Sequence, residues 1–489
     1  MADPLILVLD EGTTSTRAML FTAAGELRGT AQRELTQHYP QPGWVEHDAS
    51  EIWARTLACA REMVEQAGGA ERIAAIGITN QRETVVAWHR ETGEPLARAI
   101  VWQDRRTADF CLTLRSGGHE DAVRDATGLL LDPYFSATKM RWLLDNEPAV
   151  ARAAREGRLA FGTVESWLVF KLTEGAVHAS DAGNASRTLL LALTGTSWDE
   201  GLCGLFGVPR DALPEVVDSA GTFGRTTLFG PAIAITGLAG DQQAATVGQG
   251  CLAPGATKAT YGTGAFVLAN MGRAVPRSHH RLLGTVLYQL GGERCYALEG
   301  SVFVAGSLIQ WLRDSLQMIV RADESEALAR SVEDSAGVVV VPALSGLGAP
   351  HWRPDARGAI TGLSFAATRA HVVRAALEAI SHQTQDLAAA FAADGAAWTE
   401  LRIDGGMSGN DWLAQDIADL VDLAVVRPDF VETTALGAAM LAAVGAGLHR
   451  SLEEASAAMI GGARRFEPRM AQPVREARLA AWSEALAKV

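Results

Sequence analysis

The sequence predicts an α/β protein made of two large, related domains. Its 489 residues exceed what one hydrophobic core usually sustains. Strand-like and helix-like segments alternate along both halves, and a similar strand and turn occurs once in each half, at residues 5–17 and 258–266. We expect domains at residues 1–248 and 249–489, because glycines and a proline interrupt the pattern near residues 246–256.

The first of these segments indicates a buried strand that opens into a phosphate-binding turn. An apolar run leads to Asp10, and the residues that follow are Glu11-Gly12-Thr13-Thr14-Ser15-Thr16-Arg17. Glycine lets the backbone approach an anion, hydroxyls and amides donate hydrogen bonds, and an aspartate at a strand end can hold Mg²⁺. An ordinary hairpin turn rich in glycine and threonine is the alternative, and this segment alone leaves it open.

The second segment repeats this plan in the other half of the chain. Residues suited to a strand begin at Lys258 and run into a turn at Gly262-Thr263-Gly264. Two such turns in separate halves indicate two related domains that close on one nucleotide. This is the arrangement of actin-like (ribonuclease H-like) ATPases, in which each domain offers one phosphate loop. We therefore expect a cleft for nucleotide and substrate between the domains.

Strands and helices alternate along the first half. Asp48 is placed to cap a helix that ends at the glycines of residues 68–69. Strands are predicted at residues 73–79, 85–88 and 100–102. Polar clusters at strand ends are where α/β proteins keep their sites. Such clusters follow two of these strands, at residues 80–84 and 103–105.

The second half follows the same logic after its turn. A helix is predicted at residues 302–316, a strand at 338–341 and a long helix at 369–391. A further strand begins near residue 401 and ends in Gly405-Gly406, before a helix that starts near Asn410. These glycines suit a plain strand-to-helix turn, or a close approach of backbone to a flat nucleoside. The two phosphate turns favour the nucleoside.

Composition and charge exclude several classes of function. Hydrophobic residues make up 48% of the chain and charged residues 20%, as in a folded globular protein. The net charge of −14 argues against nucleic acid or an anionic membrane as the main partner. No Gly-Lys pair occurs, so a Walker A loop is absent from the sequence, and no apolar run reaches membrane-spanning length. We expect a cytoplasmic protein whose 5 cysteines are buried thiols rather than disulfides or metal ligands.

Two longer stretches, residues 135–143 and 358–378, match the signatures of one enzyme family in spacing and residue type. On these residues the chain resembles the FGGY carbohydrate kinases over nearly its whole length. Four ordered motifs are most similar to those of the members that act on glycerol: residues 10–15, 80–84, 102–105 and 240–243.

The resemblance implies in-line transfer of the γ-phosphoryl group of ATP to glycerol, giving sn-glycerol 3-phosphate in glycerol catabolism. Its cofactors would be ATP and Mg²⁺, with Asp10 as the metal ligand. Residues that match the nucleotide phosphate contacts are Thr13, Thr14, Ser15, Arg17 and Thr263. Residues that match the adenosine positions are Gly306, Gln310, Gly406 and Asn410.

The same resemblance implies a polar acceptor site with an aromatic wall. The hydroxyls of glycerol would meet Arg82, Glu83, Tyr134, Asp241 and Gln242, and its carbon edge would pack on Trp102 and Phe266. Asp241 would be the general base that accepts the proton of the attacking hydroxyl. A helix cap is the structural alternative for Asp241, and a plain ion pair is the alternative for Arg82 and Glu83.

Some features depart from the family pattern. Glu11 stands where many members that act on glycerol carry glutamine, and we expect the change to be tolerated. Residues 220–236 lack the Gly-Thr-Arg loop of a sugar-bisphosphate effector site and contain no histidine, so regulation by either route is not expected. Two further functions stay open: a kinase for another polyol or sugar, and an actin-like ATPase without a small-molecule acceptor. We expect a homodimer or homotetramer, although the sequence does not fix the oligomeric state.

Overall fold

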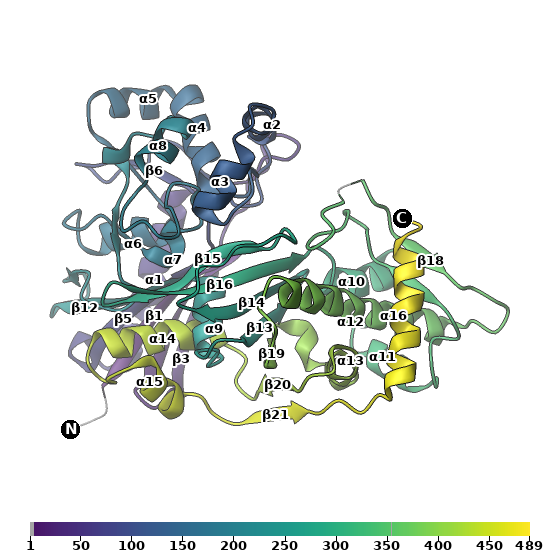
Figure 1. Cartoon of the computed structure of the whole chain (residues 1–489). Coiled ribbons are helices and arrows are strands. Elements are labelled where there is room, and N and C mark those ends of the chain that lie inside the picture. Colours follow the sequence, from purple (N-terminus) through teal and green to yellow (C-terminus); the bar gives the residue numbers. More distant parts are fainter. Residues whose placement is uncertain (1–3, 354) are drawn as a thin grey trace.

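The computed structural model describes residues 4–353 and 355–489 and contains two large sheets, one from each half of the chain (Figure 1). The first sheet has six strands in the order β11-β12-β5-β1-β2-β3. The apolar run predicted at the start of the chain forms β1, which is buried along its whole length. The strands are β1 (Leu5–Glu11), β2 (Ser15–Thr22), β3 (Leu27–Glu34), β5 (Ile73–Asn80), β11 (Arg225–Thr226) and β12 (Ile233–Gly240).

The second sheet has seven strands in the order β15-β16-β14-β13-β19-β20-β21. Its strands are β13 (Ala256–Tyr261), β14 (Ala265–Gly272), β15 (Leu283–Leu290), β16 (Glu293–Val302), β19 (Glu400–Asp404), β20 (Val425–Pro428) and β21 (Ala463–Phe466).

The two sheets share one plan. Strand β1 pairs antiparallel with β2 and parallel with β5, and β13 pairs antiparallel with β14 and parallel with β19. A further parallel strand and an antiparallel edge strand then follow in each sheet, β12 with β11 and β20 with β21. This repeated order confirms the predicted α/β architecture of two related, actin-like units. The elements before β13 are called the first unit below, and β13 with all later elements is called the second unit. The division at residues 248 and 249 stays a prediction.

Long helices cover the sheets. Helix α1 (Ala49–Ala67) packs on β1, β2 and β3. As predicted, the side chain of Asp48 caps it, and Gly68 ends it in the left-handed conformation with φ of 90°. On the second unit lie α10 (Gly306–Asp314), α11 (Glu324–Arg330), α12 (Arg369–Ala393), α13 (Asp411–Val421) and α16 (Gln472–Leu486).

Two helices from the second half of the chain pack against the first sheet. Helices α14 (Thr433–Gly445) and α15 (Leu452–Met459) share an apolar core with residues of β1 and β2, and Figure 1 shows them beneath that sheet. Helix α14 also crosses α9 (Asp241–Gly248), the helix that follows β12. The crossing requires glycine, because a Cβ atom at Gly437 would lie 1.8 Å from the backbone oxygen of Ala244. The two units are therefore joined backbone to backbone.

A helical layer sits above the first sheet and has its own apolar core (Figure 1). Its helices are α2 (Ala108–Ser116), α3 (Glu120–Thr127), α4 (Ser136–Asn146), α5 (Pro148–Arg155) and α8 (Glu200–Phe206). The remaining helices and strands are α6 (Val164–Leu172), α7 (Ala182–Ala185), β4 (Glu46–His47), β6 (Val86–His89), β7 (Ala99–Ile100), β8 (Leu159–Gly162), β9 (Ala179–Asp181), β10 (Glu215–Val217), β17 (Val339–Val341) and β18 (Ala359–Thr361).

The predicted helix at residues 302–316 is wrong at its start. Val302 ends β16, and α10 begins only at Gly306. Apolar residues 302–305 resemble a helix turn in sequence, but the backbone N–H of Ala305 bonds the oxygen of Thr263 instead. The connection thus packs on the second phosphate turn.

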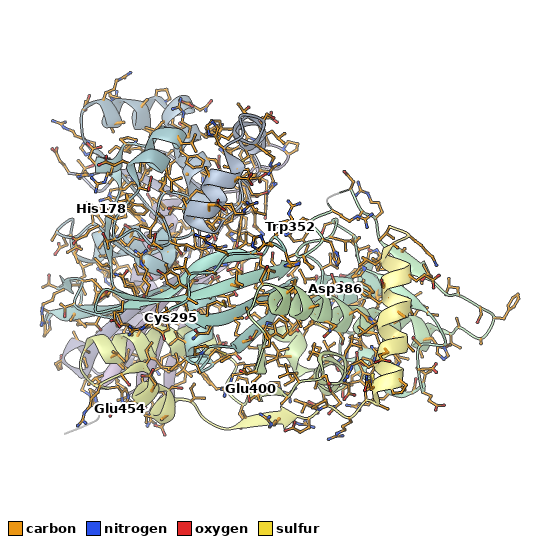
Figure 2. The ribbon with its side chains drawn as sticks, in the orientation of Figure 1. His178, Cys295, Trp352, Asp386, Glu400 and Glu454 are labelled. Atoms are coloured by element: carbon orange, nitrogen blue, oxygen red, sulfur yellow. The ribbon has the colours of Figure 1, made fainter. Side chains whose placement is uncertain are left out.

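All five cysteines are buried and free, as predicted, including Cys295 on β16 (Figure 2). Among the helices that the structure describes, none combines the length and the apolar character needed to cross a membrane.

Candidate active site

The first predicted phosphate turn is the tip of the β1–β2 hairpin. The backbone N–H of Gly12 bonds the oxygen of Ser15 at 3.0 Å, which closes the turn. Thr14 is exposed at the tip, and Thr13 accepts a 3.0 Å hydrogen bond from the indole of Trp102. The hairpin alternative and the phosphate interpretation are therefore compatible, since a hairpin carries the donors.

The second turn is the tip of the β13–β14 hairpin. Gly262 closes it through a 2.9 Å bond to the oxygen of Gly264, and Thr263 is exposed. The backbone N–H of Gly306, at the start of α10, bonds the oxygen of Gly262 at 2.9 Å. This contact places one predicted adenosine residue directly beside the turn.

Arg17 and Asp10 face each other across the first hairpin. They are register partners on β1 and β2 and form an ion pair. The other end of the guanidinium bonds Glu432, which precedes α14, at 2.6 Å. Burial raises the pKa of Asp10, Arg17 opposes that shift and Glu432 adds to it. Arg17 thus bridges two carboxylates that come from different units.

The residues around Asp10 fit a magnesium ion. Asp10 is almost fully buried, and its negative charge also raises the pKa of Asp241, so the two carboxylates are close enough to repel. A divalent cation would relieve this repulsion. Within residues 4–353 and 355–489, His, Cys, Asp and Glu form no cluster of three or more that could hold a metal. The ion would then take most ligands from phosphate and water, as Mg²⁺ commonly does.

The predicted adenosine residues lie around the start of α10 and the β19–α13 loop. A cavity of about 530 Å³ is lined by Gly405, Gly406, Gly409 and, across the loop, Arg427 and Glu432. The side chain of Met407 lies 3.3 Å from where a Cβ atom of Gly306 would be. Gln310 is exposed one turn further along α10. Asn410 caps α13 by accepting from the backbone of Leu413 at 2.9 Å.

Three aromatic residues gather into one wall. The ring centroid of Trp102 lies 5.7 Å from that of Tyr134 and 6.5 Å from that of Phe266, both edge-on. Phe266 belongs to β14 of the second unit, and the other two belong to the first half of the chain. Lys139, which is buried, holds the segment of Tyr134 by donating to the backbone oxygens of three consecutive residues, 133–135. The wall is therefore assembled from both units.

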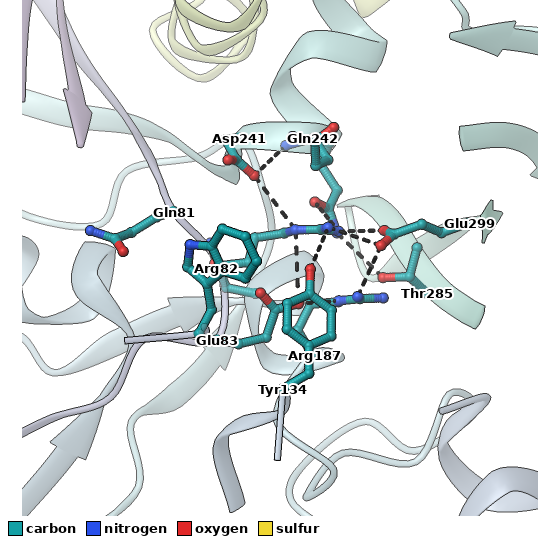
Figure 3. A network of polar contacts seen from close by, with 12 residues as sticks. Gln81, Arg82, Glu83, Tyr134, Arg187, Asp241, Gln242, Thr285 and Glu299 are labelled. Atoms are coloured by element: carbon teal, nitrogen blue, oxygen red, sulfur yellow. Dashed lines mark hydrogen bonds and ion pairs between the residues drawn. The ribbon is translucent and has the colours of Figure 1, made fainter. Parts of the chain in front are cut away.

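The predicted polar acceptor residues lie in one partly buried network (Figure 3). The guanidinium of Arg82 lies 3.5 Å from Asp241 and 3.4 Å from the hydroxyl of Tyr134. Its distance to Glu83 is 3.9 Å, and the shortest bonds of these two residues go elsewhere, to Glu299 and Arg187. Arg82 and Glu83 are thus members of a larger charge network rather than a plain ion pair.

Asp241 is the first residue of α9 and points into this network. The N-cap position belongs to Gly240, whereas the carboxylate of Asp241 accepts a 2.7 Å hydrogen bond from the backbone of Gln242. Desolvation raises the pKa of Asp241, while Arg82 and Lys258 lower it. About a third of the side chain, 34%, is exposed, so the carboxylate is accessible to a ligand. Lys258 also donates to the side chain of Gln242.

Sequence reasoning missed four charged residues of this region. They are Arg187, Lys258, Glu299 and Glu432. Lys258 and Glu299 each stand alone among uncharged neighbours in the middle of a buried strand, which is a usable signal for a functional or paired charge. The sequence around Arg187 offers no comparable signal.

Glu11 points away from the turn. Its carboxylate accepts from the hydroxyls of Thr16 and Thr56, the latter on α1, and the side chain is fully buried. Burial raises its pKa to about 8, and the two hydroxyls only partly oppose the shift. Glu11 is therefore largely protonated at neutral pH, when its shape and charge match those of glutamine.

Comparisons with known proteins identify the family of this chain. Residues 5–248 match the N-terminal domain, and residues 257–446 the C-terminal domain, of the FGGY family of carbohydrate kinases. The chain is 56% identical to a glycerol kinase of Alcanivorax borkumensis over 490 residues, 99% of this chain and 98% of that one. It is 54% identical to a glycerol kinase of Rhodospirillum rubrum over 494 residues, 99% of both chains.

Solved structures show the same likeness. The crystal structure of Plasmodium falciparum glycerol kinase with ADP superposes with a TM-score of 0.95 at 34% identity, covering 99% of this chain and 98% of that one. The crystal structure of xylulose kinase from Rhodospirillum rubrum gives a TM-score of 0.88 at 25% identity, covering 99% and 98%.

Proposed function

Because this chain belongs to the FGGY family of carbohydrate kinases, we propose that it transfers the γ-phosphoryl group of ATP to glycerol, giving sn-glycerol 3-phosphate for glycerol catabolism. The observation that carries the proposal is the acceptor site: Arg82, Glu83, Tyr134 and Asp241 in one network, beside the wall of Trp102 and Phe266. The relatives of highest identity reported above, which bear the name glycerol kinase, support the same acceptor.

A small polyol suits this combination of groups. It has little apolar surface, so its recognition depends on hydrogen bonds to its hydroxyls, with the carbon edge packed on the aromatic wall. Arg82, Tyr134 and Gln242 donate to the hydroxyls, and Glu83 and Asp241 accept from them. A ligand with the wrong hydroxyl pattern would leave buried polar groups unpaired, so the site discriminates by that pattern.

Asp241 acts as the general base. As the primary hydroxyl oxygen of glycerol bonds to the γ-phosphorus, the bond from that phosphorus to the bridging oxygen of ADP breaks, and the hydroxyl proton passes to the Asp241 carboxylate. Its raised pKa supports this role because it brings the base closer to the working pH. Arg82 and Lys258 keep the carboxylate ionised before the transfer.

The two hairpin tips hold the phosphates of ATP between the units. Thr13, Thr14 and Ser15 donate from the first turn, Thr263 donates from the second, and Arg17 supplies positive charge. Asp10 would hold a magnesium ion, which would supply charge neutralisation for the phosphates. The adenosine lies against Gly306, Gln310, Gly406 and Asn410.

An assay of ADP release against a panel of acceptors tests the proposal. The panel contains glycerol, dihydroxyacetone, erythritol, xylulose and ribulose, with a reaction lacking any acceptor as control. We expect the highest kcat/KM with glycerol and slow ADP release without an acceptor. Preference for a pentose would assign the chain to another sugar, and equal ADP release without an acceptor would indicate an ATPase.

A further inference from the structure

Glu299 is a buried carboxylate that belongs neither to the phosphate turns nor to the aromatic wall. It lies on β16 of the second sheet and has no exposed surface. Both of its oxygens bond Arg82, at 2.6 and 3.0 Å, and one of them also bonds Arg187 at 3.1 Å (Figure 3). One side chain of the second unit thus holds two arginines of the first half of the chain.

These contacts keep the Glu299 carboxylate ionised. Burial alone would raise its pKa, but Arg187 and Arg82 together lower it to about 2. The carboxylate is therefore ionised at every pH at which a kinase works. A buried ion of this kind is costly unless its geometry and partners are well defined, as they are in this two-pronged pairing.

The pairing with Glu299 decides which edge of Arg82 faces the acceptor. Glu299 occupies the edge formed by the two terminal nitrogens. The remaining Nε lies 3.5 Å from Asp241, and one terminal nitrogen also reaches the hydroxyl of Tyr134 at 3.4 Å. The free donors of Arg82 are thereby turned toward the proposed base and the aromatic wall.

Arg187 links Glu299 to Glu83 and so restrains the Glu83 side chain as well. Its Nε donates to the Glu83 carboxylate at 2.7 Å while its terminal nitrogen bonds Glu299. Glu83 has a backbone φ of 60°, in the left-handed region that L-residues seldom adopt. Ser136 donates to the backbone oxygen of Glu83 at 3.1 Å and so fixes its other side. Holding Glu83 in this conformation requires surrounding contacts, and Arg187 supplies one to its side chain.

We infer that Glu299 is a positioning residue for the acceptor site: it orients Arg82 directly and Glu83 through Arg187, so that both can read the hydroxyls of the substrate. The inference rests on the proposed function. It also means that the acceptor site of the first unit is complete only when β16 of the second unit lies against it.

The test compares steady-state kinetics of the wild type and Glu299→Gln with glycerol and ATP varied separately. We expect kcat/KM for glycerol to fall by about 10²-fold, as for a misplaced contact group. The KM for ATP should stay within about twofold, because the loss concerns acceptor binding. Glu299→Asp, which keeps the charge but shortens the reach, should recover part of the kcat/KM for glycerol.

Glu299→Gln leaves two buried arginines short of a partner and can fail to fold. The charge-matched double variant Arg187→Met/Glu299→Gln removes one cation and one anion together and keeps the network balanced. We expect it to fold and still to show a lowered kcat/KM for glycerol, through a raised KM for glycerol.

Asp416→Asn provides the matched control, since Asp416, which is buried, and Arg478, which is part-buried, form a similar two-pronged pair, at 2.6 and 3.0 Å, within the second unit. This variant should lose thermal stability without changing the KM for glycerol. An unchanged KM for glycerol in Glu299→Gln and in the double variant, with an active wild type, would overturn the inference and leave the proposed function standing. A wild type that phosphorylates none of the acceptors would overturn both.

Discussion

The two hairpin turns occupy the same place in their sheets but carry different chemistry. The strand before the first turn ends in Asp10 and Glu11, and the strand before the second ends in Thr260 and Tyr261. The first turn is surrounded by charge, through Asp10, Arg17 and Glu432, whereas the second is built from uncharged residues. The duplicated backbone therefore supplies two similar loops, and we infer that their side chains divide the work, with charged groups at the first turn and neutral donors at the second.

The division extends to the helices that follow. Asp241 begins α9 in the first unit, and Glu432 immediately precedes α14 in the second. Both carboxylates thus stand at the start of a helix after the corresponding strand. Asp241 faces the acceptor residues, whereas Glu432 bonds Arg17 at the phosphate turn. On the proposed function, the first of these positions serves catalysis and its counterpart serves nucleotide binding.

Neutralising Asp241 or Glu432 should give the largest difference in kinetics between the two units. Asp241→Asn is expected to lower kcat by about 10²- to 10⁴-fold, because the transfer loses its base. Binding of ATP, measured by calorimetry, should remain. Glu432→Gln should act mainly on the KM for ATP, and a comparable fall in kcat for both variants would contradict the division.

The contributions of the two turns to ATP binding can be distinguished in the same way. Removing the charge with Arg17→Met should weaken ATP binding by about 1.5–3 kcal/mol, as for hydrogen bonds to charged groups. Thr263→Val removes a neutral donor and should cost about 1 kcal/mol. The KM for ATP at saturating glycerol measures both, with the KM for glycerol as the control. Equal effects would mean that the turns share the phosphates evenly.

The helix crossing tests how tightly the units are joined. Gly437→Ala places a methyl group against the backbone of Ala244 and should destabilise the fold by about 1–3 kcal/mol, as overpacking does. The matched control is Gly204→Ala in α8, where a Cβ atom meets nothing within 4 Å. The control should leave the melting temperature unchanged or raise it slightly. A similar result for both variants would show that the crossing can relax.

Glu11 and Tyr261 end the two equivalent strands, and only Glu11 titrates near neutral pH. Since its folded-state pKa of about 8 lies above the ordinary 4.5, the folded chain binds this proton more tightly than the unfolded chain does. Its contribution to stability is complete below pH 4.5 and is lost as the pH rises to about 8. Burial raises the pKa of Tyr261 too, so that side chain stays neutral throughout.

Glu11→Gln should remove this dependence and make the chain more stable at pH 9, by at least about 1 kcal/mol. Urea unfolding at pH 6 and pH 9 measures the difference, with the wild type as reference. Parallel pH profiles for the two proteins would contradict the assignment of a raised pKa to Glu11.

Features that have a local sequence pattern could be predicted from the sequence alone. Alternating apolar runs and the two turns predicted both sheets, and the aromatic and polar motifs predicted side chains that the fold brings together, such as Trp102 with Phe266. Contacts between distant segments had no such pattern. Arg82 and Glu299 are 217 positions apart, and a lone charge in a strand does not name its partner. The start of α10 was misplaced because apolar residues suit a strand end and a helix equally.

The packing of α14 on the first sheet also governs how this chain is made. Residues of β1 and β2 such as Ile6, Val8 and Met19 are fully packed only when residues up to 445 have been synthesised, because α14 completes their apolar cluster. At about 5–20 residues per second, roughly 200 residues separate the end of β12 from that point by about 10–40 s. During that time the apolar face of the first sheet lacks the cover that α14 and α15 provide. We therefore expect a fragment that stops after the first unit to aggregate.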